Sequence, residues 1–434
     1  MEYLVIAAIG ALASILANKG IAVFNDGFRP IVPQYYEGSI NRKELAAMSF
    51  AISFGLVIGF GIPTSIAATI ILIHCILLST DIIGTWCADS KTGTILSGVI
   101  GAIYGIAVVA GLDFVVTLFS YLPYNFLNAL GSVSAYVMVA FAIFPSLAVG
   151  YQHGFKKGVI TALITVLIYF VVKRFGTFSM GEATMTLNAE GMAMLAGTLL
   201  MLIYAAMVKG ENGSANADLV SVFSEKVSKI RKNWLLLAAM GGLIACGTSM
   251  LIIGGDPISL ALTSKGAYSE AALAALARAI GFIPLVFTTA IVTGVYAPAG
   301  CTFVFVIGLM FVKNPLIALV LGAVIMVVEL LLINVFAKGM DKFPGVKDMG
   351  EHIRTSMNKV LEVALLVGGV TAAEAMSAAF GMSGIGALFV IGCLLLNRIS
   401  KKPIVELAIG PVACILYGIV LNLMLVLNLA QLAA

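Results

Sequence analysis

The stretch from Phe24 to Gly38 reads FNDGFRPIVPQYYEG and places acidic, basic and amide side chains between long apolar runs. Its candidate binding groups are Asn25, Asp26, Arg29 and Gln34. Two prolines and two glycines disfavour a continuous helix, because proline lacks the donor N–H and glycine costs backbone entropy. Broken backbone at membrane depth needs hydrogen-bond partners from protein or from a water-filled cavity. The stretch is therefore either an ordinary surface loop or part of a transport site.

A second polar group interrupts the apolar sequence at residues 79–86, which read STDIIGTW. Asp81 and Thr85 are its candidate binding residues, because they follow an apolar segment that is only marginally long enough to cross a membrane. The alternative for Asp81 is a structural one. Aspartate commonly caps the first free N–H groups of a helix, so Asp81 could serve the following turn instead.

A third candidate lies in residues 281–300, where two prolines bracket a threonine-rich apolar run. Thr289 and Thr293 are four residues apart and share one helical face. Together with Thr288 and Tyr296 they form the candidate binding group of this segment. A broken helix presents free N–H groups that suit a carboxylate or a phosphate. The alternative is a kinked packing helix whose threonine hydroxyls bond back to carbonyls one turn earlier.

Three carboxylates, Glu329, Glu362 and Glu374, are embedded in apolar runs. A carboxylate inside a span costs at least about 2.5 kcal/mol, so each should face a partner or a cavity. Glu329 is the first candidate for proton coupling and Glu362 the second, although Lys359 could pair with Glu362 on the preceding turn. Arg278 is the matching cation in an apolar run, and we expect it to pair with one of these acids or with a bound anion.

The sequence lacks several signatures of other chemistries. The three histidines have no metal-ligand spacing, and the six cysteines are scattered singly. Neither a phosphate-binding GxxxxGK[ST] loop nor a GxSxG nucleophile motif is present, so we predict neither a cofactor nor enzyme activity. The net charge of +4 rests on basic residues in short loops, as the positive-inside rule predicts, and indicates no nucleic-acid partner.

The composition determines which elements can position these residues. Hydrophobic residues make up 61% of the chain, charged residues 11%, and the mean hydropathy is +1.09. These values predict an all-α polytopic membrane protein with about ten to twelve transmembrane helices, some of them broken or re-entrant. We predict two membrane halves, residues 1–208 and 234–434, joined by a cytoplasmic loop at 209–233. An inverted repeat of the halves is a hypothesis from the construction of many transporters.

Four runs carry a resemblance to a known family. They are VFNDGFRPIVPQ at 23–34, TDIIG at 80–84, TTAIVTGVY at 288–296 and MNKVLEVALLVGG at 357–369. The chain resembles the YhfT family of predicted bacterial inner-membrane transporters along essentially its whole length. The resemblance implies a multi-pass protein of the bacterial inner membrane that takes up a metabolite, and it hints at a small anionic or amino-containing solute. It assigns no role to any residue.

We therefore predict a secondary active transporter that moves a small polar metabolite, with anions among the candidates, by ion-coupled alternating access. Its partners would be the small-molecule substrate, the lipid bilayer and a second copy in a homodimer. One alternative is a permease resembling the membrane component of a sugar phosphotransferase system of the ascorbate and galactitol type. Another is an intramembrane enzyme that uses Asp26 and Asp81 as a carboxylate pair.

Overall fold

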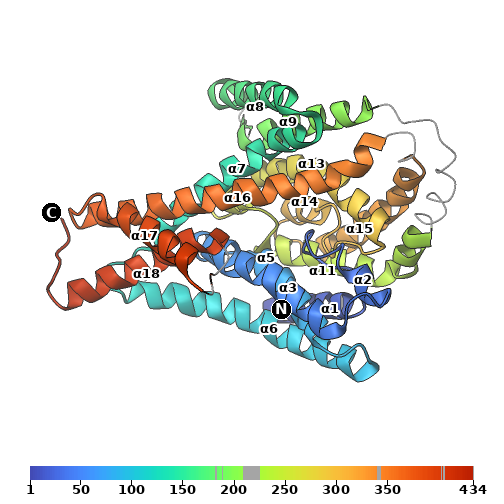
Figure 1. The fold of residues 1–434 in the computed structure, drawn as a ribbon, viewed down its shortest axis with the longest axis horizontal. Helices are drawn as coiled ribbons and strands as arrows, with labels where there is room; N and C mark the ends of the chain where they lie inside the picture. Colours follow the sequence, from blue (N-terminus) through green and yellow to red (C-terminus); the bar gives the residue numbers. More distant parts are fainter. Residues whose placement is uncertain are drawn as a thin grey trace.

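The structure is a computed structural model that describes residues 1–180, 183–187, 189–208, 225–339, 344–401, 403 and 406–433. Helices dominate it, with a few short strands (Figure 1). Most of the predicted connecting loop, residues 209–224, lies outside the described residues, as do residues 340–343. The predicted all-α class is confirmed.

The first half contains nine α-helices, one π-helix and three strands among its described residues. They are α1 (Glu2–Asn18), α2 (Val32–Tyr36), α3 (Arg42–Leu56), the π-helix η1 (Val57–Gly61), α4 (Ile62–Ala68), β1 (Ile71–Leu72), α5 (His74–Trp86), α6 (Lys91–Ser120), α7 (Leu127–His153), α8 (Phe155–Phe175), β2 (Thr177–Met180), β3 (Ala183–Thr186) and α9 (Ala189–Ala206).

The second half is built in the same manner. Its elements are α11 (Trp234–Ser249), β4 (Ile253–Gly254), α12 (Pro257–Thr263), α13 (Tyr268–Thr293), α14 (Phe303–Met310), α15 (Pro315–Gly339), α16 (Pro344–Ala379), α17 (Ile385–Ile399) and α18 (Glu406–Val426).

Six helices in the described part are long and apolar enough to cross a membrane. They lie in α6, α8, α9, α15, α16 and α18, and the bent α13 would add a seventh. The chain is therefore a membrane protein. The finer count of ten to twelve stays a prediction, because α1, α11 and α17 are apolar but shorter than the ~20 residues that a perpendicular crossing needs.

Four helices, α1, α4, α11 and α13, end in segments of extended backbone. β1 pairs in parallel with β4, and Ala22 forms a parallel bridge with Tyr296. Each extended segment follows a helix end at which one residue has a positive φ angle, which turns the chain out of the helix. These residues are Gly20, Thr69, Leu251 and Gly294. The unwound segments hydrogen-bond to one another in the protein interior, so their backbone groups are satisfied as a membrane requires.

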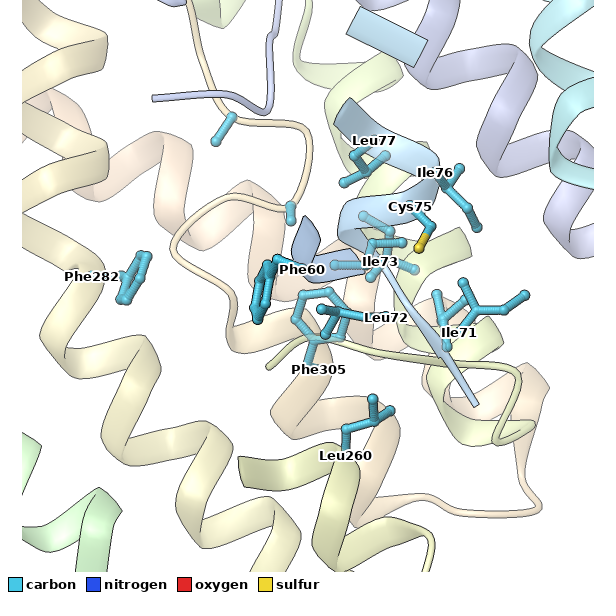
Figure 2. Close-up of a cluster of buried hydrophobic side chains, with 14 of the residues drawn as sticks. Phe60, Ile71, Leu72, Ile73, Cys75, Ile76, Leu77, Leu260, Phe282 and Phe305 are labelled. Atoms are coloured by element: carbon cyan, nitrogen blue, oxygen red, sulfur yellow. The ribbon is translucent and has the colours of Figure 1, made fainter. Parts of the chain in front are cut away.

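The interior around these breaks is packed with apolar side chains. Figure 2 shows Ile71, Leu72 and Ile73 of the β1 region beside Phe60 and Leu260, all buried. In contrast, α6 and α8 expose many large apolar side chains, among them Ile95, Phe114, Leu163 and Phe170. Such exposed apolar faces suit contact with lipid, so the broken segments lie in the protein interior and the long continuous helices α6 and α8 form part of its periphery.

Candidate functional site

A cavity of about 90 Å³ lies beside the unwound segments. Its lining comes from both halves of the chain: the segment after α1, the segment between α13 and α14, and parts of η1, α5, α13 and α16. The cavity reaches the surface beside Asn358 of α16, which is exposed. Its volume has room for several waters or one small molecule, since a single water needs about 10–15 Å³ of such space.

Two buried arginines define the charge of this cavity. Arg29 is 1% exposed and Arg278 is 4% exposed, and both line the cavity. Nε and one terminal nitrogen of Arg29 have no hydrogen-bond partner, and neither has Nε of Arg278. Arg278 also stacks over the ring of Phe282 at 4.5 Å from its centroid. Buried guanidinium N–H groups without partners are costly, so these groups are suited to receive a ligand oxygen.

Arg29 and Asp26 form an ion pair on one side of the cavity. Arg29 lies in the segment between α1 and α2. The lining contains two arginines and one aspartate, and the carboxylates of Asp81 and Asp256 also interact with these arginines. The guanidinium N–H groups without partners, rather than a net charge, favour a ligand with an anionic oxygen.

Asp81 holds the segment that carries Asn25 and Arg29. Its carboxylate accepts hydrogen bonds from the backbone N–H groups of Phe24, at 3.1 Å, and Asn25, at 2.9 Å. The Asn25 side chain donates to the hydroxyl of Ser53 and accepts from the N–H of Gly27. Asp81 does not itself line the cavity. It caps free N–H groups, as the structural alternative proposes, but those of the broken segment rather than those of its own helix.

Glu329 has the same kind of role in the second half. Its Oε2 accepts from the Tyr296 hydroxyl at 2.8 Å and from the Cys301 N–H at 2.6 Å, while its Oε1 has no partner. The side chain is 2% exposed. Glu329 thus fixes the unwound segment between α13 and α14, part of which lines the cavity through Ala297, Gly300 and Thr302.

None of the other predicted binding residues whose side chains the structure describes lines this cavity. Thr85 and Thr293 bond back to the carbonyls of Asp81 and Thr289, at 2.8 and 2.7 Å, as the packing alternative expects. Gln34 is exposed in α2. The side chain of Thr288 lies outside the described part of α13.

The two remaining carboxylates are near the surface. Glu362 pairs with Lys359 at 3.2 Å, as the alternative for this residue expects. Glu374 accepts from the N–H groups of Gly384 and Ala387 at the start of α17. Neither carboxylate lines the cavity, so Glu329 is the embedded acid closest to the cavity lining.

Two residues that line the cavity were not predicted from the sequence as binding residues. His74 presents an Nδ1 without a hydrogen-bond partner between the rings of Phe24 and Phe60, at 4.9 and 5.0 Å. Thr302 lines the cavity with a partnerless hydroxyl and has a φ angle of 75°, which is unusual for a β-branched residue. Only the three-dimensional meeting of the unwound segments brings them to the arginines.

Comparison with known proteins supports the sequence resemblance. The family model YhfT, described as a protein of unknown function, matches residues 2–430. The chain belongs to the YhfT family. It is 35% identical over 445 residues to "Uncharacterized protein YhfT" of Escherichia coli (strain K12), and the match covers 99% of this chain and 98% of that relative. No solved structure matches the chain significantly. The predicted family is confirmed, and the comparison names no substrate.

The contacts of Glu329 lead to a first testable prediction. Glu329→Leu leaves the Cys301 N–H and the Tyr296 hydroxyl without an acceptor, at a cost of about 1–3 kcal/mol for each buried group. Glu329→Gln keeps one acceptor oxygen. We expect a clear fall in the melting temperature of the detergent-purified Leu variant and a smaller fall for the Gln variant. Equal melting temperatures for Glu329→Leu and the unmodified chain would contradict the capping role.

Proposed function

We propose that the chain is a secondary active transporter of the bacterial inner membrane that carries a small anionic metabolite. The observation behind this proposal is the cavity, in which Arg29 and Arg278 present guanidinium nitrogens without hydrogen-bond partners. Guanidinium groups match the geometry of carboxylates and phosphates and bind both through paired N–H donors. The substrate class is therefore a small oxyanion, a carboxylate or a phosphate.

The surroundings of the cavity support transport. Discontinuous helices with unwound backbone inside a membrane protein are a common construction of ion and substrate sites in secondary transporters. Here the unwound segments pair two by two, and the segments after α1 and α13 contribute Asn25 and Gly300 to the cavity lining, which His74 at the start of α5 joins.

The carboxylates support a binding site better than an enzyme. Both oxygens of Asp81 accept backbone N–H groups, and Asp26 pairs with Arg29. A catalytic carboxylate pair would need one group free to exchange a proton with a substrate. The homodimer and the coupling ion stay predictions.

Flux through reconstituted protein tests the proposal. The purified chain is placed in liposomes, and uptake of radiolabelled lactate, succinate, glutamate and inorganic phosphate is followed under an imposed pH gradient. Liposomes without protein are the control. We expect at least one anion to accumulate unmodified, and its accumulation to collapse when a protonophore is added.

Two outcomes would contradict the proposal. The first is uptake of neutral analogues such as lactamide or glycerol with no uptake of any anion in the panel. The second is uptake that requires a phosphocarrier protein and yields a phosphorylated product, which would favour the phosphotransferase permease.

A further inference from the structure

The two halves of the chain contain their helices in a corresponding order. Each half begins with a helix, α1 or α11, that ends in an unwound segment. A second unwound segment follows, after Thr69 in the first half and after Gly294 in the second. Each half then continues with a shorter helix, a long helix and a group of three helices. The corresponding helices are α1 and α11, α5 and α14, α6 and α15, α7 and α16, α8 and α17, and α9 and α18. The packing corresponds too: α1 contacts α5 and α6 as α11 contacts α14 and α15, and α7 contacts α8 and α9 as α16 contacts α17 and α18.

The correspondence holds at single residues in the first helix pair. Gly10 of α1 lies so close to the backbone of Gly101 in α6 that a Cβ would not fit. Gly241 of α11 lies in the same way against the backbone of Gly322 in α15. Small residues that permit close helix contact are common in membranes, but the two pairs occupy matching places in matching helices.

The ends of α1 and α11 also have the same geometry. The N–H of Gly20 donates to the carbonyl of Ala17 with φ at 58°, and the N–H of Leu251 donates to the carbonyl of Thr248 with φ at 61°. A positive φ is ordinary for glycine and strained for leucine. Leu251 adopts it because the surrounding fold requires the same turn at both places.

A matching side chain stands just before each turn. Asn18, the last residue of α1, donates to the carbonyl of Cys87 at the end of α5, at 3.3 Å. Ser249, the last residue of α11, donates to the carbonyl of Phe311 at the end of α14, at 2.5 Å. The two halves thus join corresponding helix ends with a polar residue in the same position.

The pairings of the unwound segments complete the relation. Ala22 pairs with Tyr296, and Ile71 pairs with Ile253, both in parallel. Ala22 and Ile253 follow the corresponding turns of α1 and α11, while Ile71 and Tyr296 follow the second break of each half. A two-fold operation that exchanges the halves therefore turns one pairing into the other.

The direction of the central helices determines the orientation of this axis. Tyr124, just before α7, packs against Phe380, just after α16, and farther along α7 Val133 lies against Gly368. The two helices, which correspond to each other, therefore pack antiparallel along much of their length. A two-fold axis that relates antiparallel transmembrane neighbours lies in the membrane plane.

We propose that residues 1–206 and 234–426 are two copies of one structural unit, inverted in the membrane, and that each copy opens the central cavity to a different side. In this conformation the segment after α1 lines the cavity with Asp26 and Arg29. The corresponding segment after α11 does not line the cavity: Asp256 caps α12 by accepting from Ser259 at 2.9 and 2.6 Å, and Leu260 is packed in the core (Figure 2). The access route rests on the proposed transport function, whereas the inversion does not.

Cysteine labelling tests the inversion without any substrate. The six native cysteines are replaced, and Phe175→Cys and Ile399→Cys are introduced singly at the corresponding ends of α8 and α17, where both side chains are exposed. A membrane-impermeant maleimide is applied to intact cells and to inverted vesicles. We expect Phe175→Cys to react only from outside and Ile399→Cys only from inside. At the starts of α6 and α15, Lys91→Cys should react only from inside and Leu316→Cys only from outside. A pair that reacts from one side would overturn the inverted repeat.

The same assay tests the access route. Asn358→Cys, at the cavity mouth, should react from inside. Ile258 lies in the segment after α11 and is 3% exposed, so Ile258→Cys should react from outside, more slowly than Asn358→Cys. Ile258→Cys that stays unreactive from outside would overturn the access route while the inversion stands. Opposite sidedness without anion flux would instead overturn the transport proposal alone.

Discussion

Arg278→Gln should lower the apparent affinity for a transported anion by about 10- to 150-fold. A hydrogen bond to a charged group contributes about 1.5–3 kcal/mol, and each 1.4 kcal/mol corresponds to a factor of ten in affinity. Arg278 is buried against Phe282 and presents a partnerless Nε to the cavity, so its replacement removes both a donor and a positive charge. The concentration dependence of anion uptake into proteoliposomes measures the effect.

The control is an arginine outside the site. Arg398 is exposed and paired with Glu406 at 2.8 Å, so Arg398→Gln removes a charge without touching the cavity. It should leave the apparent affinity unchanged. Arg278→Lys should give an intermediate affinity, because lysine keeps the charge and loses the planar set of donors. Unchanged affinity in Arg278→Gln, with a normal melting temperature, would show that Arg278 does not bind the substrate.

The sequence predicts the polar break at the first helix correctly because its signal is local. Two prolines, two glycines and several charged side chains lie together from Asn25 to Gly38, and no continuous transmembrane helix can contain them. The role of Asp81 depends on a contact between segments more than fifty residues apart, which local patterns do not contain. The capping of Phe24 and Asn25 by Asp81 became visible only in the fold.

The threonine run illustrates the opposite error of sequence reasoning. Thr289 and Thr293 share a helical face, as their spacing predicts, but Thr293 donates to the carbonyl of Thr289 and so satisfies itself within the helix. Arg278, one turn before Phe282, is the polar residue of α13 that lines the cavity instead. Which polar group in a membrane helix faces a cavity depends on helix rotation, and apolar residues on all sides of α13 give no periodicity from which to read that rotation.

The internal repeat escapes detection in the sequence for a related reason. The corresponding positions share geometry rather than residue type: Gly20 matches Leu251, and Asn18 matches Ser249. Hydrogen bonds from a serine or an asparagine satisfy the same carbonyls, and a strained leucine can take the turn that a glycine takes freely. Comparison of residue identities therefore loses a relation that the backbone hydrogen bonds retain.

Asp81→Ala should damage both folding and transport, because the carboxylate is the acceptor for two N–H groups of the segment that carries Asp26 and Arg29. Each buried donor left without a partner costs about 1–3 kcal/mol, which is a large part of a typical stability of 5–15 kcal/mol. Asp81→Asn keeps one acceptor oxygen and should lose less. The melting temperature in detergent and anion uptake are measured together, with Asp113→Asn on the exposed face of α6 as the control.

The combination of the two readouts separates a positioning role from a binding role. If Asp81 positions the segment, Asp81→Asn should lower the melting temperature and the uptake rate together, and the anion selectivity should stay as it is. A changed selectivity with an unchanged melting temperature would instead place Asp81 in contact with the substrate. That result would require the cavity to extend past Asn25 to the carboxylate, and the unwound segment to move during transport.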